Sequence, residues 1–180
     1  MQALKFKLAR ESLFYSVEEA ATLVGKVDVA IWRAWEEGNA PIPESVHEKM
    51  IDLIGWRRSI MVKFFERGKE DIAQGVKPGS KLYVTFWYER QEDFIREQNM
   101  EAIYHRPMQS AFSEIGILMQ HEVALIPYDE DEFTRFLDGR ERTREIREEW
   151  DQIKALEYVQ KIKQSALESG DNPPRKRTLM

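Results

Sequence analysis

The sequence predicts an α+β protein, and three observations support this prediction. Residues 1–75 show almost continuous helical periodicity, which is broken only near Gly and Pro residues. Residues 81–88, KLYVTFWY, are β-branched and aromatic, and they follow a linker of turn-forming residues. Residues 140–168 repeat an apolar side chain at steps of three and four within a highly charged stretch. We therefore expect an all-α N-terminal domain, a small sheet-containing unit and a C-terminal helix.

Local signals delimit the first two helices. Apolar side chains near helical spacing predict a first helix from about Ala3 to Leu13. Ser16 stands three residues before Glu19 and just ahead of an apolar run, which is the pattern of a capping box. A second helix is therefore expected after Ser16, and Gly25 is expected to close it by turning the chain through a positive φ angle.

The next two helices have equally clear ends. Asp28 is a suitable N-cap for a third helix over residues 29–37, and Gly38 ends that helix. Pro43 is well placed to open a fourth helix. This fourth helix is long and amphipathic, and it is expected to extend from residue 44 to about residue 73.

After the linker, short strand and helix patterns alternate. Strands are expected at 81–88, 102–105 and 123–126. Helices are expected at 89–98, with Phe94 and Ile95 facing inward, and at 109–119. Pro107 is expected to end the second strand.

These elements predict four parts. They are a helical domain (1–75), a small α+β dimerisation unit (76–138), a charged amphipathic helix (139–169) and a disordered basic tail (170–180). The helix over 140–168 could pair with another chain or pack as an ordinary helix, and the sequence does not decide between these two.

Composition excludes several classes of protein. The chain has 27 basic and 32 acidic side chains and a formal net charge of −5, so nucleic-acid binding would require a local patch. Cysteine is absent, which excludes disulfides, cysteine zinc sites and thiol nucleophiles. No run approaches the roughly 18 apolar residues of a membrane span, and the N-terminus lacks a signal-peptide pattern. We expect a soluble cytoplasmic protein without membrane contacts.

Residues that could support catalysis lack the necessary arrangement. His47, His105 and His121 have no partner histidine at metal-binding spacing, and the acidic run 129–132 lacks the pattern of a calcium loop. There is no glycine-rich phosphate loop and no Gly-x-Ser-x-Gly elbow. The sequence therefore predicts no enzyme activity, no metal and no cofactor.

Two short helices, a tight turn and a Pro-bounded loop before another helix form the layout of a helix-turn-helix. The run over 16–43 resembles the lambda-repressor-like helix-turn-helix, whose third helix typically ends in Trp-Glu-x-Gly; here that element is Trp35 to Gly38. Within this resemblance, the run is most similar to the YdiL-like family. Three features support this: a turn one residue longer than usual, the tryptophan at Trp32 and the pair Ile42-Pro43. It is also similar to the anti-CRISPR-associated autorepressors.

The resemblance extends loosely to residues 3–120, because His105–Ser110 is similar to a Trp-Arg-x-x-Gln-Ser segment of those families. It implies a homodimer that binds a double-stranded DNA operator and regulates transcription, with the third helix in the major groove. The residues implied to face base edges are Val29, Ala30, Arg33 and Ala34. Those implied to contact phosphates are Ser16, Val17, Lys26 and Asn39. Ile31, Trp32 and Trp35 would mostly face inward.

The chemistry of these residues fits such a role. Arg33 can donate two hydrogen bonds to one guanine, and Val29 and Ala30 can contact a thymine methyl. The backbone amides near Ser16 and Val17, at a helix N-terminus, suit a phosphate. Arg57 and Arg58 could contact a phosphate or be solvated surface residues.

An alternative is an antitoxin-like or other protein-interaction module without DNA binding. Residues 1–75 hold 11 basic and 12 acidic side chains, and residues 28–37 hold three acids against one arginine. This is a poor electrostatic match to a polyanion. A positive rim around Arg33, Lys26 and Asn39 would favour DNA, and an acidic rim would favour a protein partner.

The predicted dimer interface lies in the sheet unit. Phe86, Trp87 and Tyr88 form three successive rings, which is more apolar surface than a short edge strand hides in a monomer. This strand and residues 102–119 are therefore expected to form a two-fold interface.

Overall fold

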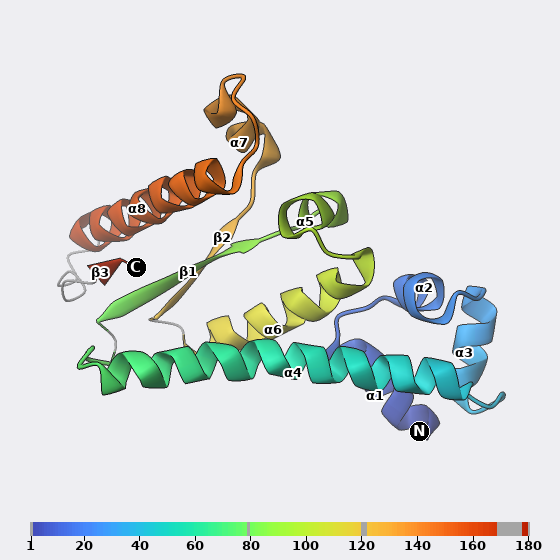
Figure 1. The fold of residues 1–180 in the computed structure, drawn as a ribbon. Helices are drawn as coiled ribbons and strands as arrows, with labels where there is room; N and C mark the ends of the chain where they lie inside the picture. The colour runs from blue at the N-terminus through green and yellow to red at the C-terminus, as the bar shows by residue number, and fades with distance from the viewer. Residues whose placement is uncertain (1, 79, 120–121, 169–177, 180) are drawn as a thin grey trace. The chain divides into compact units, whose positions relative to one another are not determined.

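The computed structural model describes residues 2–78, 80–119, 122–168 and 178–179 (Figure 1). Within these ranges the structure is mostly helical and contains a small parallel sheet, so the predicted α+β class is confirmed. The chain divides into two compact units. The first unit comprises Met1–Lys69 and Arg90–Ile115, and the second comprises Glu70–Glu89 and Gly116–Met180.

The first unit is helical. Its elements are α1 (Ala3–Ser12), α2 (Val17–Glu19), the π-helical η1 (Ala20–Gly25), α3 (Val29–Glu37), α4 (Glu44–Ala73), α5 (Gln91–Gln98), the 3-10 helix η2 (Ala102–Tyr104) and α6 (His105–Leu118). The last residues of α4 and α6 belong to the second unit. The predicted bounds of the third and fourth helices are confirmed to the residue. Proline and glycine signals define those ends, because neither residue continues a helix well.

Three aromatic rings form the centre of this unit. The Phe6 ring centroid lies 4.8 Å from that of Trp32, and the two indoles of Trp32 and Trp35 lie 5.7 Å apart. Met50 and Leu53 of α4 are fully buried in the same cluster. The buried rings fix the face of α3 that turns inward, and therefore also the face that turns outward.

Segment 90–115 belongs to this unit because of specific polar contacts. The Tyr15 hydroxyl donates to the Ile103 carbonyl oxygen, and Ser110 Oγ donates to the Ser12 carbonyl oxygen over 2.5 Å. Burial raises the pKa of the Tyr15 phenol far above 10, with the charges of Glu19 and Tyr104 adding to the effect, so this donor keeps its proton.

The predicted strand over 102–105 is wrong. These residues form η2 and the first residue of α6. The imidazole of His105 packs 5.2 Å from the ring of Phe94, and Pro107 stands in the first turn of α6, where a missing amide hydrogen costs nothing. Ile95, predicted to face inward, is 40% exposed, whereas Phe94 is fully buried.

The second unit contains the sheet. Its strands are β1 (Lys81–Trp87), β2 (Val123–Pro127) and β3 (Thr178–Leu179), in the order β2-β1-β3, and both pairings are parallel. Two helices follow β2: α7 (Glu130–Leu137), which Asp129 caps by accepting from the Glu132 amide, and α8 (Arg144–Glu168).

Of the three successive rings at residues 86–88, Phe86 and Tyr88 are covered within the chain, whereas Trp87 is partly exposed. Phe86 stacks on Trp150 of α8 with 5.0 Å between ring centroids, and Tyr88 packs 5.0 Å from Tyr128. Both Phe86 and Tyr88 are buried, so they do not supply the excess surface on which the predicted sheet interface was based. Dimerisation through 76–138 stays a prediction.

The C-terminal segment is only partly described. Residues 170–177 and 180 of the predicted basic tail lie outside the described residues, so its disorder also stays a prediction. Thr178 and Leu179 form β3, which pairs with Lys81 and Leu82 of β1. The helix predicted over 139–169 corresponds to α8, which starts later than predicted, at Arg144. It shares a hydrophobic cluster with the strands: Val159 packs with Leu82 and Ala124.

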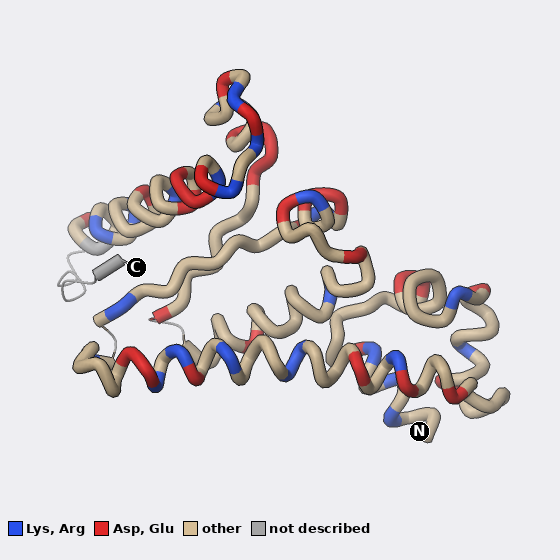
Figure 2. Tube along the Cα trace, viewed as in Figure 1, with Lys and Arg blue, Asp and Glu red and all other residues tan. Residues whose placement is uncertain are grey.

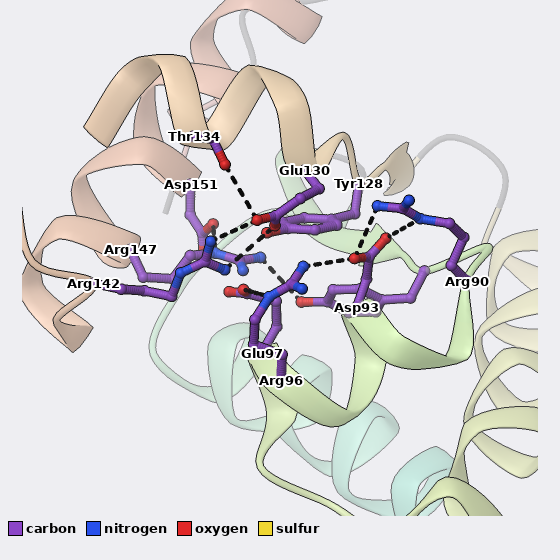
Figure 3. A network of polar contacts seen from close by, with 11 residues as sticks. Arg90, Asp93, Arg96, Glu97, Tyr128, Glu130, Thr134, Arg142, Arg147 and Asp151 are labelled. Carbon is purple, nitrogen blue, oxygen red and sulfur yellow. Dashed lines mark hydrogen bonds and ion pairs between the residues drawn. The ribbon is translucent and has the colours of Figure 1, made fainter. Parts of the chain in front are cut away.

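Polar networks occur in both units (Figure 3). In the first unit, Arg90, which precedes α5, and Arg96 of α5 bind the Asp93 carboxylate over 2.8 and 2.6 Å. In the second unit, the Glu130 carboxylate accepts from Tyr128 and Arg142, each over 2.6 Å. These bonds satisfy polar groups that stand beside apolar cores.

Candidate nucleic-acid interface

The turn between α2 and α3 is set by a capping box and a close packing contact. Ser16 Oγ accepts from the Glu19 amide and the Glu19 carboxylate accepts from the Ser16 amide, which confirms the predicted box. Gly25, however, does not have the predicted positive φ; Lys26 adopts it, at 50°. A Cβ on Gly25 would lie 3.0 Å from Trp32 Cε3, so this position is glycine because the indole packs against it.

Glu36 holds α3 in place from inside the domain. Its carboxylate accepts from Arg10 Nε over 2.6 Å and from Trp32 Nε1 over 2.7 Å, and a second Arg10 nitrogen donates to the Tyr15 carbonyl oxygen. The side chains of Arg10 and Glu36 are only 9% and 7% exposed. Sequence reasoning counted Glu36 among the acids facing a polyanion, but its charge is paired in the core.

The outward face of α3 carries most of the residues implied to read base edges. Ala30 and Arg33 are exposed, and Ala34 and Val29 are partly exposed. Ala30, Arg33 and Ala34 are spaced by three and one, so they share one stripe of the helix. Trp32 and Trp35 face inward as predicted, but Ile31 is 44% exposed, which corrects the inward expectation for that residue.

The residues implied to contact phosphates have different surroundings. Both the hydroxyl and the amide of Ser16 are used in the capping box, so the expectation of a free Ser16 amide is wrong. Val17, at the first position of α2, is partly exposed, and Lys26 is exposed in the turn. Asn39 is exposed beyond α3, and its Nδ2 donates to Glu37 over 2.9 Å.

Charges of both signs surround Arg33. One of its terminal nitrogens lies 3.6 Å from Glu18 Oε1, and both side chains are more than half exposed. Hydrogen bonds from its own backbone amide and from Ser16 lower the pKa of Glu18, with a smaller contribution from Arg33, so this carboxylate is charged at neutral pH. Figure 2 shows acidic positions in α2, and both basic and acidic positions in the turn and α3 that follow. The rim is therefore mixed rather than positive.

The two arginines of α4 differ. Arg57 Nε donates to Ser110 Oγ over 2.7 Å, and the same guanidinium binds Glu114, which fixes it between α4 and α6. Arg58 is exposed. The sequence suggested the same role for both arginines, because two adjacent basic residues do not indicate which of them lies on the side of α4 that α6 covers.

The described residues contain no group of three or more His, Asp or Glu side chains that could hold a metal ion. Within the same ranges, no helix has the length and apolar character needed to cross a membrane.

Comparison with known proteins agrees with the geometry of the N-terminal half. The model of the Aca2/YdiL-like family matches residues 1–123. A protein named Aca2 repressor, from Pectobacterium phage ZF40, is 32% identical over 74 residues. The match covers 41% of this chain and 60% of the repressor, so the chain spans about three-fifths of the length of this relative. The resemblance predicted from residues 16–43 is confirmed, and because the family model matches more than half of its length, the chain belongs to the Aca2/YdiL-like family.

Proposed function

We propose that this chain is a transcriptional repressor that binds a double-stranded DNA operator as a homodimer in a bacterial cytoplasm. The observation that carries the proposal is the exposed stripe of Ala30, Arg33 and Ala34, held outward by the buried rings of Trp32 and Trp35. The repressor name of the phage relative supports the same role.

The chemistry of the stripe fits a major groove. Small side chains at Ala30 and Ala34 leave room for the α3 backbone to approach base pairs, and Arg33 can place two donors on guanine O6 and N7. Its neighbour Glu18 is also more than half exposed, so the Arg33 side chain is not confined by a buried partner. Val17, Lys26 and Asn39 flank the stripe and would contact the phosphate backbone.

Selection of bound duplexes from a random pool, at low and at physiological salt, tests the proposal. We expect an enriched inverted repeat whose half-sites lie about 34 Å apart, or a multiple of that distance. At that site Arg33→Ala should weaken binding by about 1–3 kcal/mol and relax the preference at one base pair. Arg135→Ala removes the same charge from an exposed position of α7 and should change binding little.

A phosphate contact has a different signature from a base contact. Lys26→Ala should weaken binding to all sequences similarly and reduce the slope of log affinity against log salt by about one. If Arg33→Ala and Lys26→Ala changed affinity in the same sequence-independent way, the assignment of Arg33 to a base edge would be wrong.

One observation favours a second candidate, a protein-interaction module. Ile31 is 44% exposed on the same helix as Arg33, and Glu18 and Glu37 add negative charge nearby. Under this reading the selection returns no repeat even at low salt. Ile31→Glu should then abolish binding to a protein partner, whereas Arg33→Ala should weaken it only slightly.

A further inference from the structure

Two apolar residues in the first turn of α3 have the opposite surroundings to those that the sequence implied. Val29, implied to face base edges, is only partly exposed and packs against the hydrophobic core of the first unit. Ile31, implied to face inward, is 44% exposed. The large apolar side chain that this turn presents to a ligand is therefore that of Ile31.

Ile31 and Arg33 lie on opposite flanks of the outward face of α3. Successive residues of an α-helix are about 100° apart around its axis. The two buried tryptophans define the inner side of α3, so Ala30 points almost directly outward, with Arg33 to one side of it and Ile31 to the other. The Arg33 flank faces α2, because Arg33 lies 3.6 Å from Glu18. The Ile31 flank faces away from that carboxylate.

The neighbours of Ile31 on the helix surface carry no charge. They are Ala30 beside it and, one turn later, Ala34 and Trp35. The alanine side chains are short, so the Ile31 side chain projects beyond them. A ligand that covers Ile31 removes apolar surface from water without desolvating a charge on this flank.

The side chain of Ile31 is also rigid. A β-branched residue has one strongly preferred χ1 rotamer in a helix, so little side-chain entropy remains to be lost when a ligand binds. Alanine would form this exposed turn of helix more favourably, so the stability of α3 does not require isoleucine here. These properties suit a small apolar group held in a fixed position.

The major groove offers one such group. Its base edges present hydrogen-bond donors and acceptors, together with the methyl group on C5 of thymine. A methylated cytosine carries the same group on the same ring atom. The phosphates and the other edge atoms are polar and would gain nothing from an isoleucine.

We propose that Ile31 binds the 5-methyl group of a pyrimidine in the operator and thereby determines the preference at that base pair, a role that the sequence implied for Val29. The inference rests on the proposed function, because it assigns a base contact within the same α3 helix. Side chains on opposite flanks cannot reach one base edge, so this pyrimidine belongs to a different base pair from the guanine assigned to Arg33. The exposure of Ile31 then needs no protein partner.

Replacement of thymine by uracil tests the contact, because uracil lacks only the methyl group. Each thymine of one half-site of the selected operator is replaced singly, and affinity is measured by titration of labelled duplexes at fixed salt. For the wild-type chain we expect one replacement to weaken binding about fourfold, which corresponds to the roughly 0.8 kcal/mol of one buried methylene-sized group.

Variants of α3 assign that effect to a side chain. Ile31→Ala should weaken binding to the thymine operator and should make binding insensitive to the same replacement. Val29→Ala is the matched control, since it also shortens a β-branched residue of the first turn, and it should keep the fourfold effect of uracil. Arg33→Ala should keep it as well, because Arg33 contacts another base pair. Circular dichroism should show that all three variants keep their helices.

A second substitution in the DNA identifies the source of the methyl group. At the sensitive position, the pair is changed to cytosine–guanine and to 5-methylcytosine–guanine. The wild-type chain should bind the methylated pair about fourfold more tightly than the unmethylated one, and Ile31→Ala should not distinguish them. Tighter binding of thymine than of 5-methylcytosine assigns the contact to thymine, and the reverse order assigns it to methylated DNA.

Two results on a selected operator would overturn this inference and leave the proposed function intact: wild-type affinity that no 5-methyl group alters, or a uracil effect of equal size in wild type and Ile31→Ala. An Ile31→Ala variant that binds the operator as tightly as wild type would also overturn it, and would favour a protein contact for this side chain. If no operator is enriched at all, the proposed function fails, and the inference fails with it.

Discussion

The two compact units stabilise an arginine with little solvent exposure in different ways. In the first unit, Arg10 pairs with the Glu36 carboxylate over 2.6 Å, and the same carboxylate binds the Trp32 indole. In the second unit, the Arg147 guanidinium lies over aromatic faces, 5.0 Å from the ring centroid of Phe86 and 4.9 Å from that of Tyr128, and it binds the Asp151 carboxylate over 2.6 Å. The first site depends on directed hydrogen bonds, and the second adds several ring quadrupoles to the hydrogen bonds from Arg147 to Asp151 and Tyr88.

The difference reflects what each arginine positions. The Arg10–Glu36 pair fixes the rotation of α3, on which the outward direction of Arg33 depends. Arg147 joins α8 to the strand ends through the Tyr88 hydroxyl and the rings, where many small contacts suffice. We therefore expect removal of Glu36 to cost more than removal of Arg147.

The largest loss is expected for Glu36→Ala, which leaves the buried Arg10 charge without its short contact to Glu36 and with a longer one, 3.4 Å, to the exposed Glu11. The free energy of unfolding should fall by about 3–5 kcal/mol in urea titrations followed by circular dichroism. Glu37→Ala removes the neighbouring exposed acid and should change stability by less than about 0.5 kcal/mol. Equal effects of the two changes would mean that Arg10 finds another partner.

A smaller loss is expected for Arg147→Ala. It removes the cation from its aromatic surroundings, and the free energy of unfolding should fall by about 2 kcal/mol in the same titration. Arg144→Ala, whose side chain is 87% exposed, should leave stability unchanged. A loss for Arg147→Ala as large as that for Glu36→Ala would show that the comparison between the two units is wrong.

Tyr15→Phe should cost about 1 kcal/mol at neutral pH, because the Ile103 carbonyl loses its donor. The pKa of the buried phenol is raised, so above pH 10 the unfolded chain loses this proton while the folded chain keeps it. Wild-type stability should therefore be complete below pH 10 and fall above it. Chemical denaturation at neutral and alkaline pH should show that the difference in free energy of unfolding between wild type and variant becomes smaller as the pH rises above 10. A difference that stays constant with pH would contradict this prediction.

The smallest effect is expected for Glu18→Gln. Removing this exposed carboxylate beside Arg33 should raise the affinity for DNA modestly and without regard to sequence, because one repulsion from the phosphates disappears. Titration of labelled duplexes at several salt concentrations measures this gain. Glu145→Gln on α8 is the control, and an equal gain there would indicate a response to net charge alone.

Much of the helical fold could be predicted, because its ends carry residues that act locally. Gly38 at a φ of 79° and Pro43 before the first turn of α4 determine where α3 stops and α4 starts, whatever surrounds them. The capping box of α2 is similarly local, since both of its hydrogen bonds lie within four residues.

Features that depend on distant residues could not be predicted. The apolar run over 102–105 has the composition of a strand, but packing of His105 on Phe94 and the contacts of α6 favour a helical start. Nothing near Glu36 shows that Arg10, 26 residues away, neutralises it.

In both units, residues that contact each other lie far apart in the sequence, and this has a consequence for synthesis on the ribosome. Tyr15 of the helical unit needs Ile103, and Ser12 needs Ser110, so this unit is complete only after β1 has left the ribosome. The parallel partner of β1 begins at Val123, later still. During that interval β1 carries both an unpaired backbone edge and a row of uncovered rings, which is the combination that promotes aggregation of nascent chains. Folding yield, rather than final stability, is therefore the property most sensitive to the rate at which residues 88–127 are translated.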